Sequence, residues 1–355
     1  MWQIDNRTPF AAERAWVRDR NGAEIWLVAV RCAFDIAPDR ATMISEEQTP
    51  PVLAPEYVGE PGRSSLRFDT DLSRTKVATD VILHGHAHAP GGRMVNELEV
   101  GLMVGPVRKF LRVTGDRRWR IGATGMSMSN PAPFAKIPLV YERAYGGADA
   151  FACDDARPAW DMRNPVGCGY ALKESNLEGV PAPNIEYPQF SVEKWDDRPP
   201  PAGFGPVSSH WQPRASFAGT YDEQWMKSRM PLPPEDFDDR FFQCAPADQQ
   251  APGFLSGGEP VFLRNLSPGG DLRFHVPRVI IGFETEFYDG ARVTHKPPRL
   301  HTIVLEPDFP RISLVWHTAL PCHSRVRGLK RTIIWIKELL PKGETFDGAS
   351  LEEEE

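Results

Sequence analysis

The sequence predicts an all-β fold, mainly antiparallel, with minor helix: two β-sandwich or barrel-like lobes bridged by a loop region rich in proline, glycine and tryptophan. Three observations lead to this class. Short β-rich runs separated by turn residues fill both ends of the chain, helical periodicity is nearly absent, and 16 of the 35 prolines fall between Phe151 and Pro260. A chain of 355 residues is long enough for about two domains of roughly 150 residues.

The N-terminal β region, residues 1–145, opens with a predicted hairpin. The runs "ERAWVRD" and "EIWLVAVRCAFDI" flank Asn21 and Gly22. An Asn-Gly pair between β-rich runs is a strong hairpin signal because both residues tolerate positive φ. Further strands are expected at 77–88, 94–104, 107–113 and 118–121.

The middle region, residues 146–258, is expected to be irregular, because each proline lacks an N–H group and restricts the residue before it. It also contains Trp195, Trp211 and Trp225, which a disordered linker would lack. We therefore expect ordered loops with one short helix at "YDEQWMKSR", capped by Asp222. The three tryptophans are either core residues of these loops or part of a binding surface.

The C-terminal β region, residues 259–340, repeats the pattern of short strands and turns. Strands are expected in "EPVFLRNL", "DLRFHV", "RVIIGFETEF", "LHTIVLEP" and "RISLVWHTAL". The stretch "TIIWIKELL" fits a helix or a strand. Residues 341–355, which end in four glutamates, are expected to form an acidic disordered tail.

Composition excludes several classes of function. With 41 basic and 48 acidic residues the formal charge is -7, which gives no nucleic-acid footprint. Five widely spaced cysteines without a CxxC motif argue against a disulfide framework or a zinc ribbon. The chain shows neither a signal peptide nor an apolar run of about 20 residues, so we expect a cytoplasmic protein without membrane insertion.

The run "VILHGHAHAPGG" places His84, His86 and His88 on one face of a predicted strand. If a turn at Gly91-Gly92 paired this strand with 94–104, cross-strand His–Glu pairs would fix the register of a polar face. In that pairing His84 faces Glu99 and His86 faces Glu97.

The same residues allow a sharper alternative, a metal-dependent enzyme in which His84, His86 and Glu97 or Glu99 hold the ion. No HExxH motif or second His-x-His pair supplies a further ligand. We therefore predict structural or interface histidines, and no catalytic, cofactor-binding or metal-binding residues.

An ordered set of motifs resembles a bacterial family of domains of unknown function, whose genes typically lie beside those of type VI secretion spike proteins. The motifs are "TDVILHGHAHAPGG", "YERAYGG", "NPVGCGY", "PNIEYP", "PAGFGPV", "WQPRASFAGTYDEQW", "RMPLPPEDFDDRFFQCAPADQ" and "LEPDFPRISLVWHT". The resemblance implies an adaptor or chaperone, without cofactors, that stabilises an effector protein and loads it onto a VgrG or PAAR spike. It implies no catalytic residues. Besides the metal-dependent enzyme, a structural or carbohydrate-binding β-sandwich is the remaining alternative.

Such a role suits the residues present. A β scaffold would position loops rich in tryptophan, phenylalanine and proline, and proline lowers the entropy cost of ordering a binding surface. The effector would dock on these loops or add a strand to an exposed sheet edge.

Overall fold

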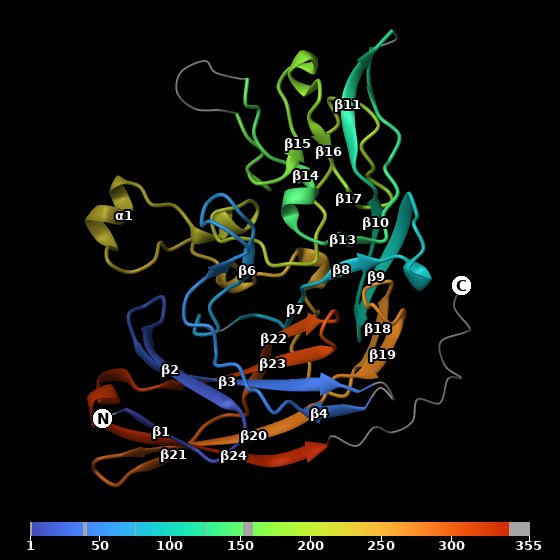
Figure 1. Ribbon diagram of the computed structural model, residues 1–355. Coiled ribbons are helices and arrows are strands. Elements are labelled where there is room, and N and C mark those ends of the chain that lie inside the picture. Colours follow the sequence, from blue (N-terminus) through green and yellow to red (C-terminus); the bar gives the residue numbers. More distant parts are fainter. Residues whose placement is uncertain (1, 38–40, 75, 124, 152–158, 341–355) are drawn as a thin grey trace.

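The computed structural model describes residues 2–37, 41–74, 76–123, 125–151 and 159–340 (Figure 1). Within these ranges the protein is mostly strands in mainly antiparallel sheets, with one α-helix, α1 (Glu223–Ser228). The all-β class with minor helix is therefore confirmed. No sheet in the described ranges closes into a barrel. The predicted acidic tail, 341–355, lies outside the described residues.

The largest sheet has six strands. In spatial order they are β2 (Ala11–Arg18), β3 (Glu24–Ile36), β23 (Arg311–Pro321), β22 (Arg299–Glu306) and β7 (Asp80–Leu83), with β4 (Thr42–Ile44) paired to the end of β3. The interior strand β3 is buried along nearly its whole length. Both of its faces are covered, which explains why it is a continuous apolar run rather than an alternating one.

The predicted hairpin is confirmed as the antiparallel pair of β2 and β3. Its loop is closed by Asp19, whose Oδ1 accepts hydrogen bonds from the backbone N–H groups of Asn21 and Ala23, both at 2.8 Å. Gly22 has a φ of 86°, which a residue with a Cβ rarely adopts.

Two further sheets complete the body. The four-stranded sheet has the order β1 (Gln3–Asn6), β24 (Leu329–Leu340), β20 (Arg278–Phe287) and β21 (Arg292–Thr294). The five-stranded sheet has the order β17 (Ile185–Glu186), β10 (Val107–Thr114), β9 (Glu97–Val104), β18 (Pro260–Arg264) and β19 (Leu272–His275). The stretch "TIIWIKELL", which fits either a helix or a strand by sequence, is part of the strand β24.

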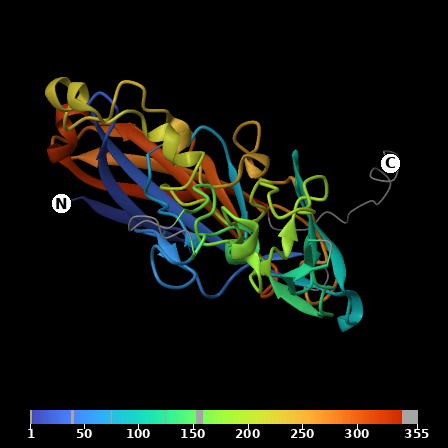
Figure 2. The same ribbon diagram turned by 90° about the horizontal axis from the view of Figure 1, so that it is seen from above.

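The regions 1–145 and 259–340 contribute strands to all three of these sheets. One continuous apolar core joins them. It contains Val28 and Leu314 of the six-stranded sheet, Ile281 of the four-stranded sheet, and Val100 and Leu263 of the five-stranded sheet. Figure 2 shows the blue and red strands running together toward one end of the molecule, with the teal strands at the other.

The remaining strands are short. They form the sheet β12 (Gly125–Met128), β11 (Arg117–Gly122) and β16 (Pro181–Ala182), and the pairs β13 (Lys136–Pro138) with β8 (His86–His88), β14 (Tyr145–Gly146) with β15 (Cys168–Gly169), and β5 (Glu56–Tyr57) with β6 (Leu66–Phe68). A small second core, which includes Trp119 and Tyr145, lies beneath β11 and β16.

Between β14 and β18 the regular elements are only a few residues long, and we call residues 146–258 the loop-rich region. The helix α1 forms where the sequence predicts it, and the Asp222 carboxylate caps it by accepting from the Trp225 N–H at 2.8 Å. The 3-10 helices of the described chain are η1 (Pro90–Gly92), η2 (Tyr141–Arg143), η3 (Glu174–Leu177), η4 (Arg214–Ala218), η5 (Asp239–Phe242), η6 (Ala247–Gln249) and η7 (His323–Gly328).

Candidate functional site

The predicted pairing of the histidine strand with 94–104 is wrong. β7 runs parallel to β22, and β8 pairs antiparallel with β13, so neither strand lies beside β9. Glu97 and Glu99 instead lie opposite Thr114 and Arg112 of β10. Gly91 and Gly92 end a turn of 3-10 helix rather than close a hairpin.

The predicted division of side chains between two faces is confirmed. Val81, Leu83 and Ala87 are fully buried in the main core, whereas Ile82 packs on the opposite face against Cys244 and Ala245. That second face was expected to be polar and wet. At β7 it is instead covered by the loop-rich region, as the complete burial of Asp80 shows.

His86 and His88 converge on a carboxylate that the sequence did not suggest. Asp308 lies in the turn between β22 and β23, with Oδ2 at 2.5 Å from His86 Nδ1 and Oδ1 at 2.7 Å from His88 Nε2. Lys136 Nζ lies 3.4 Å from Oδ2. Burial opposes ionisation of Asp308, but these hydrogen bonds and charges outweigh it and lower the pKa of the carboxyl. The contacts pin the turn that carries Phe309, whose side chain is 80% exposed.

His84 lies apart from this pair. Its ring packs edge-on against Phe68, with ring centroids 4.8 Å apart. Burial lowers its pKa to about 3, aided by the charges of Arg67 and Arg31. Among the described residues, no three or more His, Cys, Asp and Glu side chains are arranged to hold a metal ion. The proposed set of His84, His86 and Glu97 or Glu99 is not brought together.

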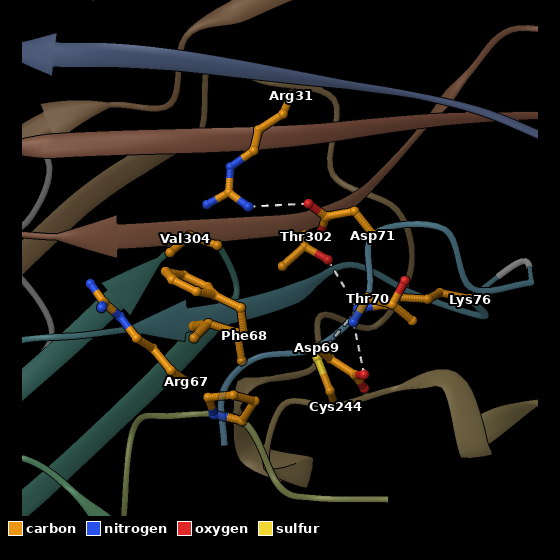
Figure 3. A pocket seen from close by; sticks show the side chains of 12 residues that line it. Arg31, Arg67, Phe68, Asp69, Thr70, Asp71, Lys76, Cys244, Thr302 and Val304 are labelled. Carbon is orange, nitrogen blue, oxygen red and sulfur yellow. Dashed lines mark hydrogen bonds and ion pairs between the residues drawn. The ribbon is translucent and has the colours of Figure 1, made fainter. Parts of the chain in front are cut away.

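A buried polar cluster joins the loop-rich region to the six-stranded sheet, and Figure 3 shows three of its members, Lys76, Cys244 and Thr302. Lys76 Nζ lies 2.5 Å from Asp80 Oδ2 and donates to Thr302 Oγ1 at 2.9 Å. Asp80 also accepts from the backbone N–H of Cys244 at 2.8 Å and from Gln243 Nε2 at 2.9 Å. Burial alone would lower the pKa of Lys76, but the charge of Asp80 raises it, so the lysine is a cation paired with a carboxylate.

This cluster does not form a catalytic centre. Burial raises the pKa of the Cys244 thiol to about 12, so the sulfur is not a thiolate nucleophile near neutral pH. The adjoining cavity, where Arg31 points to Asp71 in Figure 3, has a volume of about 20 Å³. Such a space holds about one water molecule. We therefore assign the cluster a structural role.

A second buried cation anchors the loop-rich region to the five-stranded sheet. Lys109 of β10 donates to the Gly203 carbonyl at 2.6 Å, to Asp248 Oδ1 at 2.9 Å and to Gln249 Oε1 at 2.9 Å. Burial lowers the pKa of Lys109 to about 8, against the opposing charge of Asp248. Nε2 of the same glutamine donates to the backbone carbonyls of Val81 and Phe204, at 2.7 and 2.9 Å.

Other polar side chains tie the loops to one another. Arg214 donates to the carbonyls of Phe241 and Val207, at 2.7 and 2.8 Å. Asn164 is fully buried and donates to the carbonyls of Tyr141 and Tyr145, at 2.8 and 3.0 Å. Loops without ladder hydrogen bonds thereby have their buried backbone groups satisfied.

The loop-rich region also presents apolar side chains to solvent. Its exposed large apolar residues are Phe151, Trp160, Met162, Leu172, Phe190, Tyr221, Met226 and Met230, here called the loop-rich surface. The sequence did not decide whether three tryptophans are core residues or part of a binding surface. Trp211 is buried against Tyr141, and Trp195 and Trp225 are half-buried. All three therefore pack mainly within the loops.

Tyr221 and Met226 belong to a projecting lobe around α1, visible at the left of Figure 1. The Tyr221 ring packs edge-on against Trp225, with centroids 4.7 Å apart, and Trp225 Nε1 donates to the Leu232 carbonyl at 2.8 Å. Arg229 fixes the lobe to the β2–β3 hairpin by donating to the Arg20 carbonyl at 2.8 Å. The lobe is thus fixed to the hairpin and presents apolar side chains to solvent.

No described helix has both the length and the apolar character needed to span a bilayer.

Neither the curated proteins nor the solved structures include a match to the chain. A family model described as "Uncharacterized protein conserved in bacteria (DUF2169)" matches residues 21–317, well over half of the chain. The chain belongs to this bacterial family.

Proposed function

We propose that the protein is a type VI secretion adaptor or chaperone that binds an effector protein and loads it onto a VgrG or PAAR spike. The order of motifs along the chain supports this role through the resemblance they carry. Membership of a conserved bacterial family is compatible with it and says nothing more specific.

The structural observation that carries the proposal is the build of the loop-rich region. About a third of the chain has little regular structure, yet the buried Asp80, paired with Lys76, and the buried Lys109 fix it to two sheets. A surface held in this way loses little conformational entropy on binding, which favours affinity. Loops placed on a rigid scaffold are a common means of recognition.

We place the effector contact on the α1 lobe of the loop-rich surface. Met226 is 57% exposed, and Tyr221 and Met230 are also exposed beside it. Methionine side chains adapt to irregular apolar partners, and tyrosine is enriched at protein interfaces. The effector segment recognised there is accordingly apolar.

Co-expression with the products of neighbouring genes tests the role. We expect an effector encoded nearby to co-purify with the protein, and the effector's level to fall when the protein is deleted. The proposal fails if no neighbouring product co-purifies and effector levels are unchanged.

A pair of matched variants tests the placement of the contact. M226D should weaken effector capture at least tenfold, because the aspartate would be desolvated in an apolar interface. M94D changes a methionine of similar exposure, 63%, outside the loop-rich region and should leave capture unchanged. Equal effects of the two variants would remove the α1 lobe from the interface.

A further inference from the structure

An open hollow lies away from the histidines and the buried cations. Its volume is about 530 Å³. Small-molecule sites typically enclose about 300–1,000 Å³. Its walls come from the start of β11, the chain after β12, η2, and the β15 and β16 segments. The lining residues are Asp116, Arg117, Arg118, Ser129, Asn130, Ala132, Glu142, Arg143, Cys168, Pro181, Ala182 and Asn184.

The two carboxylates in this lining are already engaged within the protein. Both oxygens of Glu142 accept from Ser65, one from its backbone N–H at 2.7 Å and one from its hydroxyl at 2.8 Å. Asp116 Oδ1 accepts from Arg143 Nη1 at 2.8 Å and from Asn184 Nδ2 at 3.0 Å. Burial opposes ionisation of Asp116, but the hydrogen bonds outweigh it and lower the pKa, so the group remains ionised.

The donors in the lining are less fully used. Arg117 donates from Nη2 to the Pro183 carbonyl at 2.7 Å and to Glu186 at 3.1 Å, and its Nε is buried away from the cavity. Arg143 makes both its bonds to Asp116 and Asn184 through Nη1. Arg118 is exposed at the rim and bonds the Gly179 carbonyl through Nη1.

The surplus of donors defines the ligand chemistry. Three guanidinium groups and two carboxylates line the cavity, a formal sum of 3 − 2 = +1. The printed bonds of Arg118 and Arg143 use Nη1 alone, so their other N–H groups can donate to an oxygen acceptor in the cavity. The planar guanidinium fork matches the two oxygens of a carboxylate. A single carboxylate group, with one negative charge, suits the small charge excess better than a dianionic phosphate group.

We propose that this cavity, between β11, η2 and β16, binds a carboxylate-bearing ligand through Arg118 and Arg143. Two sources share this chemistry: an acidic side chain on a peptide segment, and a free small carboxylate. The site is independent of the adaptor role, because none of the exposed apolar side chains of the loop-rich surface lines it.

Calorimetric titration of the full chain tests the site with four probes: acetylated and amidated tetraglutamate, the matching tetraglutamine, citrate and inorganic phosphate. We expect saturable binding of at least one carboxylate probe, no binding of tetraglutamine, and weaker binding of phosphate. Tighter binding of tetraglutamate than of citrate assigns the site to an acidic segment, and the reverse order to a small carboxylate.

The variants compare two exposed arginines on one strand. R118E should weaken binding of the carboxylate probe at least tenfold, whereas R120E, two residues along β11 and outside the lining, should not. Thermal melts of both variants verify folding. The proposal is overturned if neither carboxylate probe binds saturably, if phosphate binds best, or if the two variants weaken binding equally. These outcomes are separate from co-purification, so the adaptor role and this site fail or stand independently.

Discussion

The sheets and the loop-rich region are stabilised by different means. In the sheets, ladder hydrogen bonds satisfy the backbone, and burial of apolar side chains such as Val100 and Leu314 supplies the stability. In the loop-rich region, long polar side chains such as Arg214 and Gln249 reach backbone carbonyls that no ladder serves. A proline-rich segment can thus be ordered without regular structure, provided that specific polar residues are buried with it.

The largest expected effect is a fall in the free energy of unfolding on acidification. His295, His301 and His317 are buried and His84 is half-buried. Burial lowers the pKa of each: to about 3 for His84, to about 4 for His295 and His317, and well below the usual value for His301. The unfolded chain, with histidine pKa values near 6.5, binds more protons than the folded chain between about pH 4 and 6.5. The free energy of unfolding should therefore fall as the pH drops through this window, by up to about 1.4 kcal/mol per histidine per pH unit.

Urea unfolding at several pH values measures this loss. H317F replaces one titrating ring with an apolar ring, so its free energy of unfolding should depend less steeply on pH. An unchanged pH dependence in the variant would contradict the assignment of a buried neutral imidazole at this position.

The next effect is the loss of a buried ion pair. K76M leaves Asp80 as an uncompensated buried charge and should lower the free energy of unfolding by about 3–5 kcal/mol. K227M removes an exposed pair with Glu223 and should cost less than about 1 kcal/mol. Denaturant unfolding compares the two. A small effect of K76M would show that the cluster does not anchor the loop-rich region.

A pair of core substitutions contrasts the two regions directly. L102A leaves a cavity in the apolar core and should cost about 2–5 kcal/mol. Q249L keeps a side chain of similar size but removes the amide that donates to two buried carbonyls. It should lower the free energy of unfolding by about 1–3 kcal/mol. Hydrogen exchange should rise across the whole molecule in L102A and mainly in the loop-rich region in Q249L. Identical exchange profiles would argue that the two regions unfold as one unit.

The smallest expected effect concerns Lys109 in alkali. Its pKa of about 8 in the folded state is below the ordinary value of 10.5, so between these values the unfolded chain binds more protons. This lysine should therefore stabilise the fold progressively as the pH rises from 8 to 9.5, by about 1–2 kcal/mol. K109M should lose that increment relative to the original protein. Measurement of unfolding at both pH values tests the prediction, and equal slopes would refute it.

Local features of the fold could be predicted from the sequence. The hairpin at Asn21-Gly22 and the helix capped by Asp222 follow from residues adjacent in the chain. The alternation of Val81, Ile82 and Leu83 between two faces follows from strand geometry alone. These interactions need no knowledge of distant segments.

The site features depended on distant segments and were missed. Asp308 approaches His86 from 222 residues away, and Thr302 meets Lys76 across 226 residues. β7 and β22 pair in parallel, so no hairpin turn in the sequence predicts that they are neighbours. One signal was present: Asp80 begins the apolar run of β7, and a carboxylate at such a position requires a buried cationic partner.

The antiparallel pairing of β3 with β23 has a consequence for synthesis on the ribosome. Asp35 of β3 pairs with Arg311 of β23, which lies 276 residues later in the chain. The centre of the largest sheet therefore cannot form until Arg311 has been synthesised. At about 5–20 residues per second, translation of that interval takes roughly 14–55 s. During this time the apolar β3 lacks one of its neighbours, so the nascent chain presents an aggregation-prone edge that a trigger-factor-type holdase would need to shield.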